Sequence, residues 1–220
     1  MGLSVAVGTS EEADFGELGN ALEEAGLRAH DEPRLDEAAC FSADMFGYSG
    51  LHYLRRVAAH LALKREVPGP GDDKSDDDPV VKEYYAQVTP EPPGLFARMF
   101  QKTRAPEKLP FQHLMLHSDA EGYYIPQDFP EVVFPRDDLQ IPGGMIGSSH
   151  RLLAECSELA KWLGLPENLD YESEEVWDAA ESPALDGPQW KRFGVESFSC
   201  LRLIAAAERS LKSGAAVVFC

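Results

Sequence analysis

The chain has 220 residues, of which 44% are hydrophobic and 26% are charged, as in an ordinary globular protein. Its formal net charge is −18, because 38 aspartates and glutamates outnumber 20 lysines and arginines. This charge argues against binding to nucleic acid or to an anionic membrane surface, since both require basic patches. It favours a soluble protein, or one whose partner is a basic protein.

The sequence predicts neither an export signal nor a membrane-spanning segment. The opening residues MGLSVAVGTSEEADFG contain no basic region, and no run of about 18 apolar residues occurs anywhere. The four cysteines, Cys40, Cys156, Cys200 and Cys220, lie far apart and form no C-x-x-C motif. This usage is typical of a reducing compartment, so we expect a cytoplasmic protein.

The first part of the chain predicts a strand at 3–7 and then a helix over 10–26, capped by Ser10 and ended by Gly26. Helical spacing of apolar residues predicts the next helix over 49–65. Residues 66–79 are rich in Pro, Gly and Asp, which indicates a flexible acidic loop. We interpret it as a loop within one domain spanning 1–220, with a domain boundary as the alternative.

A further helix is predicted to begin at Asp78–Pro79, and residues 89–110 look irregular, with a possible short helix over 95–101. Next, the sequence predicts a hairpin of two strands, 111–117 and 122–126, and a third strand at 131–135. Residues 141–165 predict a turn followed by a long helix that Ser148 or Ser149 caps, and a last helix over 195–211 and a closing strand at 215–220 follow. This order predicts an α+β fold with a small, mostly antiparallel sheet packed with several helices.

One candidate site centres on HSDAEGYYIP, which begins at His117. His117, Asp119 and Glu121, joined by His150 through folding, would form a set for divalent-metal or acid–base chemistry. We favour the other interpretation, a structural turn, because Asp and Gly often form turns. On a strand, His113 and His117 would lie about 13 Å apart, too far to share a metal ion. We therefore expect no bound metal and no cofactor.

The second candidate site is GGMIGSSHR at 143–151. Glycines before a helix start allow an anion to approach the backbone amides. The residues of this hypothetical anion site are Gly143, Gly144, Gly147, Ser148, Ser149 and Arg151. The alternative is a simple turn in which Ser148 caps the helix.

The two stretches HSDAEGYYIPQDFPEVVF and GGMIGSSHRLLAECSELAKWLGL resemble a group of uncharacterised bacterial cytosolic proteins. Their pattern is His-Ser-Asp-x-x-Gly-Tyr-Tyr-x-Pro followed by a Gly-Ser-Ser-capped helix. The resemblance covers about 111–165 and implies no known activity. In size and charge, the chain is also similar to the immunity proteins of bacterial toxin systems.

Three functions remain open. The favoured one is an acidic binding protein, for instance an immunity-type inhibitor, that uses its acidic stretches at 11–37 and 167–186 to attract a basic protein. Its aromatic anchors would be Tyr123, Tyr124, Tyr171 and Trp177. The alternatives are a metal-dependent or phosphate-ligand enzyme that uses His117, Asp119, Glu121 and His150, and an interaction module in a larger assembly. No oligomeric state is predicted.

Overall fold

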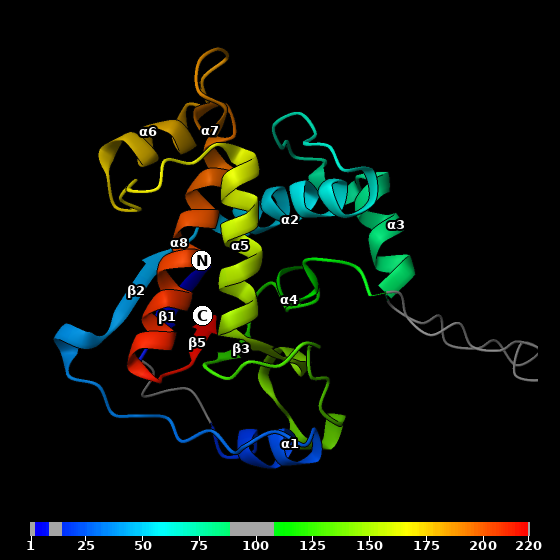
Figure 1. Cartoon of the computed structure of the whole chain (residues 1–220), viewed down its shortest axis with the longest axis vertical. Coiled ribbons are helices and arrows are strands. Elements are labelled where there is room, and N and C mark those ends of the chain that lie inside the picture. Colours follow the sequence, from blue (N-terminus) through cyan, green and yellow to red (C-terminus); the bar gives the residue numbers. More distant parts are fainter. Residues whose placement is uncertain (1–2, 9–14, 89–107, 220) are drawn as a thin grey trace, which may run out of the picture.

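The computed structural model describes residues 3–8, 15–88 and 108–219. These contain one five-stranded sheet in the order β2-β1-β5-β3-β4 (Figure 1). All neighbouring strands are antiparallel except the parallel pair β3 and β4. The strands are β1 (Ser4–Val7), β2 (Phe41–Asp44), β3 (Gly122–Ile125), β4 (Ile146–Ser148) and β5 (Val217–Phe219).

Helices account for most of the regular structure in the described part of the chain, so the predicted α+β class is confirmed. The α-helices are α1 (Leu18–Glu24), α2 (Gly47–Lys64), α3 (Pro79–Val88), α4 (Gln112–Met115), α5 (Ser149–Leu163), α6 (Glu174–Glu181), α7 (Gln189–Arg192) and α8 (Gly194–Ser213). Short 3-10 turns are η1 (Glu37–Ala39), η2 (Ser75–Asp77), η4 (Asp137–Leu139) and η5 (Pro142–Gly144). Within these described segments, no helix combines the length and the apolar character needed to cross a bilayer.

The sheet separates two apolar clusters, because alternate residues of each strand point to opposite faces. On one face, α5 and α8 pack together and cover Val217 and Phe219 of β5 and Tyr124 of β3 (Figure 1). On the other face, α1 covers Tyr123 and Val218. The first turns of α8 extend beyond the sheet, where α6 and α7 pack on them in a third cluster.

The predicted hairpin is wrong. Residues 112–115 form helix α4, and β3 pairs with β5 and β4 instead. The helix begins after Phe111, whose φ is 67°. The carboxylate of Glu155, on α5, accepts hydrogen bonds from the backbone N–H groups of His113 and Leu114 at 3.1 and 2.8 Å. This cap comes from more than 40 residues away, so local alternation could not reveal it.

Most other elements lie where the pattern placed them. The strands near 3–7 and 215–220 and the helices near 49–65, 141–165 and 195–211 are all present. Ser148 caps α5 by accepting a hydrogen bond from the backbone N–H of Arg151, and Gly164 ends it in the left-handed conformation. The predicted strand at 131–135 is reduced to one bridge between Val133 and Ile146.

Three other predictions are tested only in part or not at all. The first helix is described only from Leu18, and its expected cap Ser10 lies outside the described residues, as does the predicted helix over 95–101. The single-domain organisation over 1–220 stays a prediction.

Candidate functional site

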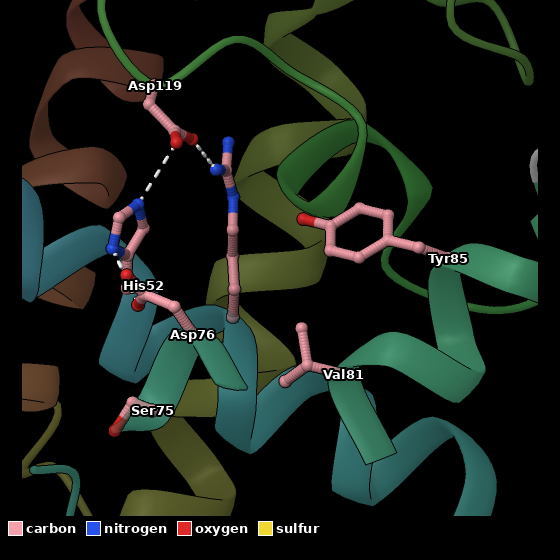
Figure 2. Close-up of a pocket in the computed structure, with 7 residues that line it drawn as sticks. His52, Ser75, Asp76, Val81, Tyr85 and Asp119 are labelled. Atoms are coloured by element: carbon pink, nitrogen blue, oxygen red, sulfur yellow. Dashed lines mark hydrogen bonds and ion pairs between the residues drawn. The ribbon is translucent and has the colours of Figure 1, made fainter. Parts of the chain in front are cut away.

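A pocket of about 210 Å³ lies between α2, η2, α3 and the turn that precedes β3 (Figure 2). Its wall includes His52, Arg55, Asp76, Val81, Tyr85 and Asp119. His52 and Arg55 are three positions apart on α2, so both side chains project from one face of the helix. The pocket therefore collects charged groups from three distant parts of the sequence.

Arg55 anchors the turn. Its side chain is only 5% exposed, and its Nε donates a hydrogen bond to the carbonyl of Leu114 at 2.8 Å. The two terminal nitrogens donate to the Asp119 carboxylate and to the His117 carbonyl. The hydrogen bond from His52 and the charge of Arg55 hold the pKa of Asp119 well below its usual range.

His52 connects two carboxylates from separate segments. Its Nε2 lies 3.0 Å from Oδ2 of Asp119, and its Nδ1 lies 2.7 Å from Oδ1 of Asp76. The hydrogen bond to Asp119 raises the pKa of His52 above its ordinary value, although burial opposes this shift. The arrangement can therefore hold a proton on the ring between two negative charges.

The structure brings only part of the predicted acid–base set together. Asp119 lies in the pocket, whereas Glu121 and His150 are exposed. The ring of His117 is buried and stacked on Tyr124, with centroids 4.1 Å apart, and this burial lowers the pKa of His117 to about 3. In the described residues, the partners of Asp119 are His52 and Arg55.

Sequence reasoning missed Arg55 and His52 as partners of Asp119. The only available signal was their shared face on α2. Over the described ranges, no cluster of three or more His, Cys, Asp or Glu side chains could hold a metal ion.

The GGMIGSSHR turn packs beside the Asp119 turn. A side chain at Gly143 would approach the Glu121 carbonyl oxygen to 2.5 Å, and one at Gly147 would overlap the ring of Tyr124. The hydroxyl of Ser148 donates to the Gln127 carbonyl at 2.6 Å. Gly143 and Gly147 therefore serve close packing at this point.

The other polar groups of the hypothetical anion site also bond internally. Ser149 shares a hydrogen bond of 2.8 Å with Ser210, and Arg151 forms an ion pair with Asp128. Gly144 completes the turn at positive φ. These contacts favour a structural role for the turn, and anion binding there stays an untested prediction.

Two of the four expected aromatic anchors are buried. Tyr123 and Tyr124 are at most 1% exposed, because they lie on β3 and point to opposite faces of the sheet, where helices cover both. They cannot contact a partner at the surface of this structure. Tyr171 is partly exposed, and Trp177 on α6 is 39% exposed. Of the four, these two remain available.

Two acidic segments, 66–79 and 167–186, flank the first turns of α8. On one side, the backbone N–H of Gly71 donates to the Glu196 carboxylate at 2.7 Å. On the other side, the ring of Trp177 lies 4.6 Å from that of Phe198. Figure 1 shows both segments at the same end of the molecule, at the top of the view. We call this the acidic end; its exposed carboxylates belong to Asp72, Asp73, Asp76, Asp77, Glu172, Glu174, Glu175, Asp178, Glu181 and Asp186.

Few cations offset these carboxylates. Among the described residues, Lys82 pairs with Asp77, Lys191 pairs with Glu175 and His52 contacts Asp76. The helix α6 carries its remaining acids without an ion pair to any described residue. Its apolar side, which includes Val176, packs on α8, so these carboxylates project from a fixed helix.

A comparison with known protein families gives one match over nearly the whole chain. Residues 1–219 match the model of a family described as "Putative DNA-mimic protein", whereas no curated protein and no solved structure matches the chain. A DNA mimic acts in nucleic-acid recognition by standing in for DNA. The prediction that the partners have no connection with nucleic acid is therefore wrong, whereas the prediction of a basic protein partner conflicts with this match only in part. The chain belongs to the Putative DNA-mimic protein family.

Proposed function

We propose that the protein binds a DNA-binding protein by placing its carboxylates where the phosphates of DNA would lie. The match to a DNA-mimic family over residues 1–219 carries this proposal. Two physical features support it, the net charge of −18 and the acidic end. Surfaces that bind DNA are rich in lysine and arginine, and a face of exposed carboxylates attracts them for the same reason that phosphates do.

The contact is proposed to centre on α6. Glu174, Asp178 and Glu181 are exposed on this helix beside the half-buried ring of Trp177. Carboxylates steer a positively charged surface toward the helix, while an aromatic side chain provides an anchor from which water is excluded. Because α6 is packed against α8, little conformational entropy is lost when the partner binds.

Occupation of a DNA-binding face prevents that face from binding DNA, so the protein acts as a competitive inhibitor. In a bacterial cell, this corresponds to an immunity-type role in which the inhibited protein acts on nucleic acid. The acidic runs would otherwise be interpreted as solvated faces, which is the commoner case.

The test begins with proteins from the producing cells bound to DNA-cellulose at fixed salt. The purified protein should elute a specific subset of these proteins. Each eluted protein should be able to bind DNA and to bind this chain, but never both at the same time. A ternary complex with DNA would contradict the proposal. So would elution no stronger than that caused by an unrelated protein of equal negative charge.

A matched pair of variants locates the contact. The first carries Glu174→Gln, Asp178→Asn and Glu181→Gln on α6. The second removes the same three charges at exposed positions elsewhere, with Glu23→Gln, Asp31→Asn and Asp137→Asn. The first should weaken partner binding about tenfold or more, and the second much less. Equal weakening by both would show that net charge alone matters and would exclude α6 as the centre.

A further inference from the structure

His52 links the acidic end to the rest of the protein through both ring nitrogens (Figure 2). One contact goes to Asp76 in the acidic loop and the other to Asp119 in the turn before β3. The contact with Asp119 is a hydrogen bond and the contact with Asp76 is an ion pair, and both place a negative charge beside the ring. Two negative charges beside one ring favour the protonated imidazolium, which can donate from both nitrogens.

The charged surroundings of His52 determine which contact is weaker. Arg55 from α2 holds Asp119 in place, and Tyr85 from α3 lies across the pocket with its hydroxyl bonded to the Met115 carbonyl at 2.9 Å. Asp76 is 61% exposed, and His52 is its ion-pair partner among the described residues. When the ring loses a proton, one nitrogen presents a lone pair to a carboxylate, and Asp76 is the carboxylate that is free to leave.

Other contacts limit how far the loop can move. Arg56 binds the Asp78 carboxylate at 2.6 Å and the Gly69 carbonyl at 2.8 Å, and Gly71 is bonded to Glu196. These anchors hold both ends of the loop regardless of the charge on His52. The part between them, 72–77, includes η2 and contributes four of the exposed carboxylates of the acidic end.

We propose that His52 is a positioning residue for the acidic end, whose imidazolium fixes residues 72–77 in the arrangement that the partner binds. Loss of the ring proton releases Asp76 and loosens this segment, so binding weakens as the pH rises. The proposal rests on the proposed function, because it assumes that the acidic end forms part of the contact.

The raised pKa of His52 gives the direction of the effect. The folded form holds the proton more tightly than the unfolded chain, so the link is complete below about pH 6.5 and is lost as the pH rises through the higher pKa of the folded state. The neighbouring carboxylates do not reverse this direction, because Asp119 stays ionised throughout this range.

The first test needs no partner. In a nuclear magnetic resonance titration from about pH 6 to about pH 9, the amides of residues 72–77 should shift with the same midpoint as the ring of His52. The Asp76→Asn variant should lower that midpoint, and His52→Gln should abolish the shift of the segment. His150→Gln, at an exposed histidine on α5, is the control and should leave it unchanged. A segment that stays still while His52 titrates would overturn the proposal.

The second test uses a partner identified by competition with DNA. Its affinity for the parent protein should fall about two- to fivefold across the His52 titration, which is the effect of one partly exposed ion pair. With His52→Gln, this part of the pH dependence should disappear. A partner that competes with DNA but binds parent and variant with the same pH profile would overturn the positioning role alone. If no protein competes with DNA, it is the proposed function that fails.

Discussion

The guanidinium of Arg55 forms an ion pair with the carboxylate of Asp119, although 64 residues separate them in the sequence. Arg55 is nearly inaccessible to water, so its charge is compensated by Asp119 and by the carbonyls of Leu114 and His117. A buried charge of this kind is costly unless its partners are present. The pair therefore fixes the turn before β3 against α2 and gives the pocket its shape.

Replacement of Asp119 by Asn should test this anchoring role. The variant keeps the size of the side chain but removes the charge opposite Arg55, and we expect the free energy of unfolding to fall by about 2 kcal/mol. Urea unfolding at neutral pH measures the loss. Glu121→Gln, at an exposed residue of the same turn, should change stability by less than about 0.5 kcal/mol. Equal stability of the two variants would contradict the anchoring role of Asp119.

The elements that could be predicted are those whose stabilising signals are local. The apolar stripe and the Ser148 and Gly164 caps of α5 all lie within that segment. The helix α4 could not be predicted, since its amides are capped by Glu155 from another helix. The same limit applies to the pocket, because Asp119 is a plausible turn residue by sequence and acquires its partners only when α2 packs beside it.

The charge of the chain led to a partly wrong conclusion about nucleic acid. A net charge of −18 argues against binding to a phosphate backbone. The same charge is what a protein needs to imitate that backbone. The composition of this chain alone cannot tell whether its partner binds phosphate or is repelled by it. Only the family match makes this distinction.

Gly194→Ala should weaken the packing that supports α6. A Cβ atom at this position would lie 1.7 Å from the backbone carbonyl oxygen of Ala179, so α6 or the start of α8 must move. We expect a loss of about 1–3 kcal/mol or more, measured as a shift in the urea midpoint. Gly19→Ala is the control, because its Cβ would meet no atom within 4 Å and α1 should gain slightly in helix propensity. A Gly194 variant as stable as the Gly19 variant would show that the close contact does not limit packing.

The carboxyl group of Glu155 should make stability fall as the pH rises through the weakly acidic range. Burial raises its pKa to about 7, against the opposing effect of its hydrogen bonds to Leu114 and His113. Between the ordinary value of 4.5 and about 7, the folded protein retains a proton that the unfolded chain releases, so folding becomes less favourable with increasing pH.

Glu155→Gln tests this effect because glutamine carries no titrating proton. The variant loses one of the two acceptors for α4 and should be less stable than the parent at about pH 5. The deficit should shrink by about 1–2 kcal/mol, or become a gain, by about pH 7. Glu167→Gln, at an exposed position beyond the end of α5, provides the control. A difference between Glu155→Gln and the parent that does not change with pH would contradict the raised pKa.

Acid should destabilise the protein through His117. The ring is buried against Tyr124 and Phe219, and burial lowers its pKa to about 3. The unfolded chain binds a proton at this residue below about pH 6.5, whereas the folded protein does not, so stability is lost as the pH falls from 6.5 toward 3.

Phenylalanine cannot take up a proton, and its flat ring can retain the stacking on Tyr124. In His117→Phe, the loss of unfolding free energy between about pH 7 and about pH 4.5 should therefore be about 2 kcal/mol smaller than in the parent. His150→Phe makes the same chemical change at an exposed position and measures how much of the effect comes from the substitution itself. Urea unfolding of all three proteins at both pH values decides the matter, and an equal acid sensitivity of His117→Phe and the parent would rule out His117 as a source of the instability.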